Sequence, residues 1–461
     1  MGADANSQSV FTNPIILSNI FSYLDIHRVQ TFRTVSSTWN TIGAAVLGTR
    51  KVFSMRRFSR NSATADEIQN VNPALLKRIC FQSEFHTEIT LFKCVTTNIG
   101  RQIKEIHICI NSPAWLALIE ILSTNGLPNL GKLVLSTYSD LPAPAFGLVA
   151  LGNLEVLEIR GNNLENANND LQTMIGSAAS LKTLKIHGPF FPDLQNCAKT
   201  LKTLEWFALS DEQYSVDNLD QLHPLLTQVS PTLEKLCLGI CPVQFNGFSI
   251  QQSVTRFPPF PKLKSFKNMA SEVLKVGEYL PENFPSLVSL SLDLFDLSRE
   301  HHSWDVHHDQ PVKRRPGNPF PNVTHLTIMR MKVASGLDYC REPNCLPHLF
   351  EICATWKLLT HLDVVIGTQA LPLSKILKAL KSLDTGSGLS EVRIVGVDNK
   401  LQKTVFDDLA SDVEKLIDFI TKCHALKRLT FTGIWWKPET VVRVMEFLAK
   451  RGSTLPVVIL E

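Results

Sequence analysis

The sequence predicts an α/β fold: a short N-terminal module of three helices, followed by a horseshoe-shaped solenoid with parallel strands inside and helices outside. Three observations lead to this prediction. Residues 11–50 hold three short apolar helical patterns, a hexapeptide pattern of apolar residues returns many times after residue 100, and helical patterns separate several of its copies. We expect the helical module at 11–50, a linker with a degenerate first repeat region at 51–86, and the solenoid at 87–461.

The N-terminal module is predicted from its capping residues and its apolar spacing. Asn13 and Pro14 are a favoured start for a helix, Asp25 is suited to cap a second, and Ser36 or Ser37 can cap a third. The first helix has one apolar face, formed by Ile16, Ile20, Phe21 and Leu24. Three helices this short bury too little surface to be stable alone, so a partner or the rest of the chain must cover them. We therefore interpret the segment as a docking module.

The repeat is the pattern apolar-x-x-apolar-x-apolar. Its copies begin at Ile103, Leu130, Leu154, Leu181, Leu201, Leu233, Leu263, Leu287, Val323, Leu359, Leu389, Leu426 and Leu455. The copy at Leu263 is poor, because Asn268 stands at its last apolar position. Successive copies begin roughly 20 to 37 residues apart, which is similar to the spacing of leucine-rich repeats. Because the last two apolar positions alternate, each copy predicts a short strand whose apolar side chains point into the core.

Helices are predicted between several of these strands, over 112–126, 412–423 and 437–452. Their spacing predicts inward-facing side chains at Trp115, Leu116, Ile119 and Leu122 in the first helix, and at Val441, Val442, Met445 and Leu448 in the last. A Rossmann-type sheet would also alternate strands with helices. It requires longer buried strands and a glycine-rich turn, and the sequence has neither, so the solenoid is preferred.

Two stretches do not follow the repeat. Residues 51–66 are basic and polar and predict a link, after which 79–81 and 89–92 are candidate strands of degenerate first repeats. Residues 298–321 are rich in histidine, proline and charge, and predict an insertion loop between two repeats.

Composition favours a protein of the cytoplasm, the nucleus or both. The ten cysteines lack disulfide-like spacing, no signal peptide is visible, and no stretch is long and apolar enough to cross a membrane. The net charge of +3 gives no argument for nucleic acid or a membrane surface as a partner.

The sequence contains no catalytic motif of the types GxxxxGK[ST], HExxH or GxSxG, so we expect a chain that is not an enzyme and holds no cofactor. Two groups of residues raise the question of zinc: His301, His302, His307 and His308, and Cys340, Cys345 and His348. Their order matches no common zinc site, so we expect no metal. An enzyme that uses a metal at the histidine-rich loop is kept as a third hypothesis.

Residues 11–50 together with the repeats resemble the F-box proteins with leucine-rich repeats. That family begins its F-box with Leu-Pro, ends the first helix with Ile-Phe-x-Tyr-Leu, and has Val-Cys-x-x-Trp at the centre. The corresponding residues here are Asn13-Pro14, Ile20-Phe21-Ser22-Tyr23-Leu24 and Val35-Ser36-Ser37-Thr38-Trp39. The sequence departs from the pattern at Asn13 and Ser36, and it has Arg28-Val29 in place of Asp-Leu.

The resemblance implies the substrate-recognition subunit of an SCF-type (Skp, cullin, F-box) ubiquitin ligase. The F-box would dock on the Skp adaptor, and through it on the cullin-RING ligase, while the repeats would hold an unidentified target protein for ubiquitination and proteasomal degradation. The adaptor contacts that it implies are Pro14, Ile16, Leu17, Ile20, Phe21, Leu24 and Val29. Val35 and Trp39 are expected to hold the F-box together. The alternative is a leucine-rich-repeat interaction scaffold whose degenerate F-box has no ligase role.

Strand alternation predicts that the third, fifth and seventh residues of each repeat line the inner surface of the solenoid. The candidates for target binding are Arg160, Lys185, His187, His325, His361, Arg393 and Arg428, together with Trp435 just past a repeat strand. The surface is mixed in sign, so a phosphate-rich ligand is not favoured over a protein surface. Trp435 and Trp436 can equally cap the C-terminal core.

Overall fold

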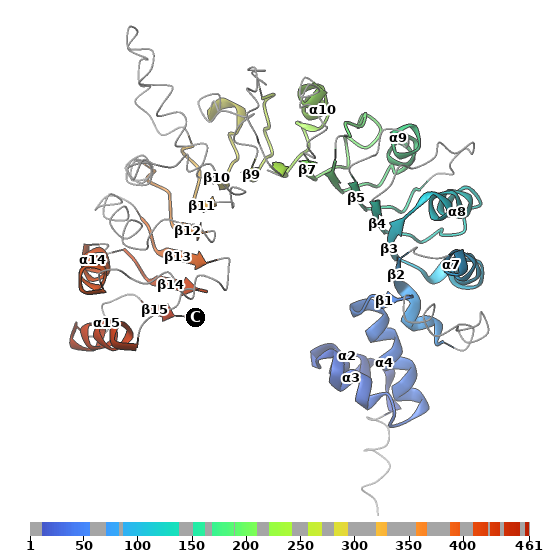
Figure 1. Ribbon diagram of the computed structural model, residues 1–461, viewed down its shortest axis with the longest axis horizontal. Coiled ribbons are helices and arrows are strands. Elements are labelled where there is room, and N and C mark those ends of the chain that lie inside the picture. The colour runs from blue at the N-terminus through green and yellow to red at the C-terminus, as the bar shows by residue number, and fades with distance from the viewer. Residues whose placement is uncertain are drawn as a thin grey trace, which may run out of the picture. The chain divides into compact units, whose positions relative to one another are not determined.

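The chain combines helices with parallel β-sheet, which confirms the predicted α/β class (Figure 1). The computed structural model describes residues 12–55, 71–82, 86–137, 151–161, 168–188, 190–209, 221–241, 257–269, 281–293, 320–329, 356–366, 388–396, 409–422, 425–433, 438–451 and 457–460. The chain divides into two compact units, Met1–Leu201 and Lys202–Glu461. Most of the predicted insertion loop at 298–321 lies outside the described residues.

The N-terminal module consists of the helices α2 (Pro14–Tyr23), α3 (Ile26–Phe32) and α4 (Ser37–Arg50). Each begins at a predicted cap. The Asn13 side chain accepts hydrogen bonds from two amides of the first turn of α2, and Asp25 accepts one from the first turn of α3. For α4 the cap is Ser36, whose hydroxyl oxygen accepts from the Trp39 amide at 3.2 Å. The local sequence therefore determines where all three helices start.

The module has a small core of its own. Phe21, Val29 and Leu47 are buried at its centre, one from each helix. The Trp39 ring packs edge-on against Phe21, with ring centroids 5.5 Å apart, and against Phe32 at 5.9 Å. Trp39 thus lies inside the module as predicted.

In the first unit the strands follow one another in chain order and pair in parallel (Figure 1). They are β1 (Phe53–Ser54), β2 (Arg78–Gln82), β3 (Glu105–Ile110), β4 (Lys132–Thr137), β5 (Val156–Gly161) and β6 (Thr183–His187). The helices α7 (His86–Ile99), α8 (Ser112–Ser123) and α9 (Asn168–Ser177) lie on one side of this sheet. The short 3₁₀ helices η1 (Pro73–Lys77) and η2 (Gly100–Gln102) precede β2 and β3. We call the side opposite the helices the open face.

The second unit repeats this arrangement. Its strands are β7 (Thr203–Leu209), β8 (Lys235–Cys241), β9 (Ser265–Met269), β10 (Ser289–Asp293), β11 (His325–Met329), β12 (His361–Ile366), β13 (Glu391–Gly396), β14 (Arg428–Thr432) and β15 (Val457–Leu460). They also pair in parallel and in chain order. The connecting segments include α10 (Leu222–Val229), η6 (Pro281–Asn283), α14 (Leu409–Lys422) and α15 (Pro438–Arg451). Within this unit as well, the helices lie on one side of the strands (Figure 1).

Every copy of the repeat forms a strand, which begins at its third residue. In β6, for example, Leu184 and Ile186 are fully buried, while Thr183, Lys185 and His187 lie half-buried on the open face. The poor copy at Leu263 also forms a strand, β9, and Asn268 is completely buried there. The rings of Phe257, Phe266 and Phe284 pack together next to this strand and supply apolar contacts that the asparagine cannot.

Three expectations for the helices and early strands are wrong. Residues 89–92, predicted as a strand, lie in α7, because Phe92 and Val95 are buried at helical spacing and Phe92 stacks on Phe81 of β2. Leu116 of α8 is exposed, and Leu118 takes the inner position. In α15 Val444 is buried and Val441 is half-buried, whereas Val442 and Met445 are exposed; the side chain of Leu448 lies outside the described residues.

Candidate protein-binding surfaces

The N-terminal module carries an exposed apolar surface on α2 and just after α3. Ile16 and Ile20 stand one turn apart on α2 and are 37% and 40% exposed, and Tyr23 follows at 89%. Ile15 and Pro14 are exposed at the start of the same helix. Such a group of large apolar side chains on one short helix is typical of a surface that another protein covers.

The predicted adaptor residues divide into two groups. Pro14, Ile16 and Ile20 are exposed and Leu24 is half-buried, so these four can contact a partner. The other three, Leu17, Phe21 and Val29, are fully buried inside the module and support the exposed surface from below.

The expectation for Val35 is wrong. It was expected to hold the module together, but it is 62% exposed, in the turn between α3 and α4. Phe32, which precedes this turn, is also partly exposed while its ring packs on Trp39. Val35, Tyr23 and Ile15 are therefore surface residues that sequence reasoning did not assign to contact. The Ile-Phe-x-Tyr-Leu motif did contain Tyr23, so a signal for it was present.

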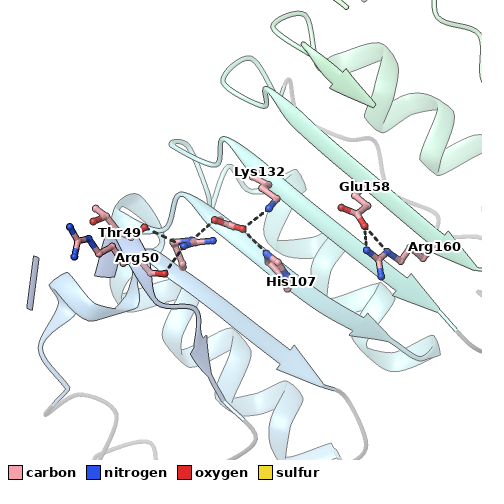
Figure 2. A network of polar contacts seen from close by, with 8 residues as sticks. Thr49, Arg50, His107, Lys132, Glu158 and Arg160 are labelled. Atoms are coloured by element: carbon pink, nitrogen blue, oxygen red, sulfur yellow. Dashed lines mark hydrogen bonds and ion pairs between the residues drawn. The ribbon is translucent and has the colours of Figure 1, made fainter. Parts of the chain in front are cut away.

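Two arginines lie at the C-terminal ends of the module's helices: Arg50 joins α4 to α2 within the module, and Arg78 joins α4 to the sheet of the first unit. Arg50, the last residue of α4, donates hydrogen bonds to the backbone oxygens of Leu24, at 2.7 Å, and Ser22 at the end of α2. Arg78 of β2 donates to the backbone oxygens of Thr49 and Arg50 at 3.2 and 3.0 Å (Figure 2). These oxygens are at helix C-termini, where backbone acceptors lack partners and the helix dipole favours a cation.

The packing at this junction is close as well. A Cβ atom placed on Gly48 of α4 would lie 1.8 Å from the backbone oxygen of Ala74 in η1, so only glycine allows the two backbones to approach so closely. The module is therefore fixed to the sheet by backbone packing and by charged hydrogen bonds.

Glu105 on β3 is the centre of a charged network on the open face of the first unit (Figure 2). Its carboxylate pairs with Arg78 of β2, lies 2.8 Å from Lys132 Nζ of β4, and lies 2.6 Å from His107 Nε2. Burial raises the pKa of Glu105, but the hydrogen bonds from Arg78, Lys132 and His107 outweigh it and bring that pKa to about 2. The carboxylate is therefore ionised, and it is paired with side chains from its own strand and both neighbouring strands.

The candidates for target binding in the first unit lie on neighbouring strands of the same face. Arg160 of β5 pairs with Glu158 of its own strand, and this carboxylate is itself buried (Figure 2). Lys185 and His187 lie half-buried on β6, in register with Glu158 and Arg160. The register brings the three candidates together, next to carboxylates that offset part of their charge.

In the second unit the candidates lie on four consecutive strands. His325, His361 and Arg428 stand in one register row with Glu391, and Arg393 stands in the next row with Asp363. The two imidazole rings stack, with centroids 4.1 Å apart and planes 9° apart. Trp435 lies outside the described residues, as do the histidines of the 298–321 segment and the residues Cys340, Cys345 and His348.

Each of the two imidazoles is hydrogen-bonded to a threonine hydroxyl. Thr360 Oγ1 lies 2.8 Å from His361 Nδ1 and donates its own proton to the Thr324 backbone oxygen. The other ring nitrogen, His361 Nε2, lies 3.7 Å from Glu391 Oε2. Thr324 Oγ1 contacts His325 Nδ1 at 2.7 Å. Burial lowers the pKa of His325 and the neighbouring His361 lowers it further, while Asp363 and Glu391 oppose this, so the environment favours the neutral ring.

Within the ranges that the structure describes, no three histidine, cysteine or acidic side chains stand close enough together to hold a metal ion. None of the helices described is both long and apolar enough to cross a membrane. A scan against protein-family models matches no family, and a search of curated proteins finds no match either.

Proposed function

We propose that the chain is the substrate-recognition subunit of an SCF-type ubiquitin ligase. In this proposal residues 11–50 are an F-box that docks on the Skp adaptor, and the strands and helices that follow are a leucine-rich-repeat solenoid that binds a target protein. The chain itself catalyses no reaction. It acts by holding the target near the cullin-RING ligase that the adaptor recruits.

The observation that carries the proposal is the exposed apolar surface of α2. Ile16, Ile20 and Tyr23 point away from a core that Leu17 and Phe21 already fill, so the module does not need them for its own packing. Complete burial of one such isoleucine is worth about 1.5–3 kcal/mol. A partner that covers several of them can bind tightly through this helix alone.

The junction between module and sheet supports the same role. A receptor of this kind must hold its target at a defined position relative to the adaptor. The contacts of Arg78 and Gly48 fix the module next to the first strands, whereas a free linker would not. Rigid positioning of this kind raises the effective concentration of the target at the ligase.

Co-purification of the full chain with the Skp adaptor tests the proposal. We expect the wild-type chain to retain the adaptor, and the double variant Ile16→Asp, Ile20→Asp to lose at least about 100-fold in affinity, because two carboxylates would be buried without partners. The control is Val442→Asp, Met445→Asp, which changes a more exposed apolar pair on α15, 55% exposed at both positions. A wild-type chain that retains no adaptor, or a double variant that binds as well as the control, contradicts the proposal.

The second candidate is an interaction scaffold without a ligase role. One observation favours it: Leu17, Phe21 and Val29, which the resemblance assigns to adaptor contact, are buried within the module. In that case the adaptor would fail to bind although the α2 surface is intact. The same co-purification therefore separates the two candidates.

A further inference from the structure

The open face of β11–β14 has a charged part and an apolar part. The strand register places His325, His361, Glu391 and Arg428 in one row, and Thr327, Asp363, Arg393 and Thr430 in the next. The third row holds Met329, Val365 and Val395, all half-buried, followed by Thr432. We call Met329, Val365 and Val395 the apolar row.

The apolar row is not a requirement of the fold. In the first unit the same register row holds Cys109, Ser136, Arg160 and His187. The core side chains of both units point to the other side of the sheet, so these positions can be polar without loss of packing. Three apolar side chains side by side on the open face therefore indicate a surface that contacts something else.

Asp363, in the row beside them, is the second feature. It is half-buried, and among the residues that the structure describes it has no hydrogen bond or ion pair. Burial raises the pKa of its carboxyl, although Arg393, His361 and His325 oppose this effect. A partly desolvated carboxylate without a donor gains more from a new cationic partner than an exposed charge does.

The neighbouring groups favour a basic occupant over an acidic one. The stacked histidines stand in the register row beside that of Asp363, and His361 Nε2 lies 3.7 Å from Glu391 Oε2. Arg393 and Arg428 are exposed to water, so an acidic partner would gain little from pairing with them. Within the described part of the chain no donor is hydrogen-bonded to Asp363, so a basic partner can supply one there.

We propose that this surface binds a segment of the target protein in which a basic side chain lies beside apolar ones. The basic group pairs with Asp363, and the apolar side chains cover Met329, Val365 and Val395. Four strands at about 4.8 Å spacing span about 14 Å, which is the length of about four extended residues. The role of this contact in target recognition rests on the proposed function, but the binding itself can be measured without the adaptor.

Fluorescence anisotropy with three labelled octapeptides tests the inference on the full chain. One peptide alternates Leu and Arg, the second alternates Leu and Glu, and the third alternates Ser and Arg. We expect the Leu–Arg peptide to bind at least tenfold more tightly than the other two. Asp363→Asn should weaken it at least tenfold and Val365→Ser about threefold, while the control Glu155→Gln, which changes an exposed carboxylate of the first unit, leaves the affinity unchanged.

Two results would overturn the inference. One is a Leu–Glu peptide that binds as tightly as the Leu–Arg peptide, and the other is a folded Asp363→Asn variant with unchanged affinity. If the adaptor fails to bind but the Leu–Arg peptide binds as expected, the proposed ligase role is contradicted and the proposed peptide-binding surface is supported. If the adaptor binds and none of the peptides binds, the peptide-binding surface is contradicted and the proposed ligase role is not.

Discussion

The open faces of the two units use acidic residues in opposite ways. In the first unit Glu105 and Glu158 are almost completely buried, and each is paired with cations from its own or neighbouring strands. In the second unit Asp363 is half-buried without a hydrogen bond among the described residues, and Glu391 is 3.7 Å from the nearest imidazole nitrogen. The same strand positions thus hold the structure together in one unit and leave charges available for binding in the other.

This difference follows from what each face is attached to. The Glu105 network begins at Arg78, which also holds the last carbonyls of α4, so the first face is part of the joint that carries the N-terminal module. The strands β11–β14 form no such joint with the described helices. Replacing a carboxylate on each face and comparing the effects on stability can therefore test this difference.

The largest effect is expected at the joint itself, from Gly48→Ala. In a helix interior this change normally stabilises by about 1 kcal/mol, because alanine is the better helix former. Here the added Cβ would lie 1.8 Å from the Ala74 oxygen, so we expect a loss of about 2–4 kcal/mol in the free energy of unfolding. Urea denaturation measures it, and Gly152→Ala is the control, since a Cβ there meets nothing within 4 Å. A Gly48→Ala variant that is more stable than the wild type would contradict the close packing of α4 against η1.

The strands of both units were predictable from the sequence, and the joint was not. Each repeat copy fixes which side chains face the core, and the strand forms even where Asn268 replaces an apolar residue. The contacts of Arg78 with α4 go to backbone oxygens, which every residue has, so no sequence pattern marks them.

Helical faces were predicted less well than strands. In α15 the buried face is rotated about the helix axis from the predicted one. Val444 is buried while Val442 and Met445 are exposed, although all three are apolar. For the candidate surfaces, the alternation rule placed Arg160, His325 and Arg393 on the open face correctly. It could not show which charges are paired, because pairing depends on side-chain rotamers and on the register between strands.

A paired comparison of Glu105→Gln with Glu391→Gln should give the next largest effect. We expect Glu105→Gln to cost about 2 kcal/mol at pH 7, because Arg78 and Lys132 lose a buried carboxylate. Glu391→Gln should change stability by less than about 0.5 kcal/mol, since that side chain is exposed.

The pH dependence gives this comparison a second measurement. The pKa of Glu105 is about 2 in the folded chain, below its usual value of 4.5, so its stabilising effect is complete above pH 4.5 and disappears as the pH falls toward 2. Urea denaturation at pH 7 and pH 3 should therefore show the cost of Glu105→Gln shrinking at the lower pH. Equal costs for both variants at pH 7, or a cost of Glu105→Gln that does not change with pH, would contradict the division between the two faces.

The smallest effect, and the one of opposite sign, is expected for Asp363→Asn. Because burial raises the pKa of this carboxyl and no hydrogen bond among the described residues compensates, removing its charge should stabilise the folded chain by several tenths of a kcal/mol. Thermal unfolding at pH 7.5 measures this change, and the gain should shrink as the pH falls and the wild-type carboxyl itself becomes neutral. A half-buried carboxylate that lowers stability and has no hydrogen bond among the described residues is best explained by binding to another molecule, because such a contact can offset the cost. If Asp363→Asn instead destabilises the chain as Glu105→Gln does, Asp363 has a structural partner, and the two open faces do not differ in the way described above.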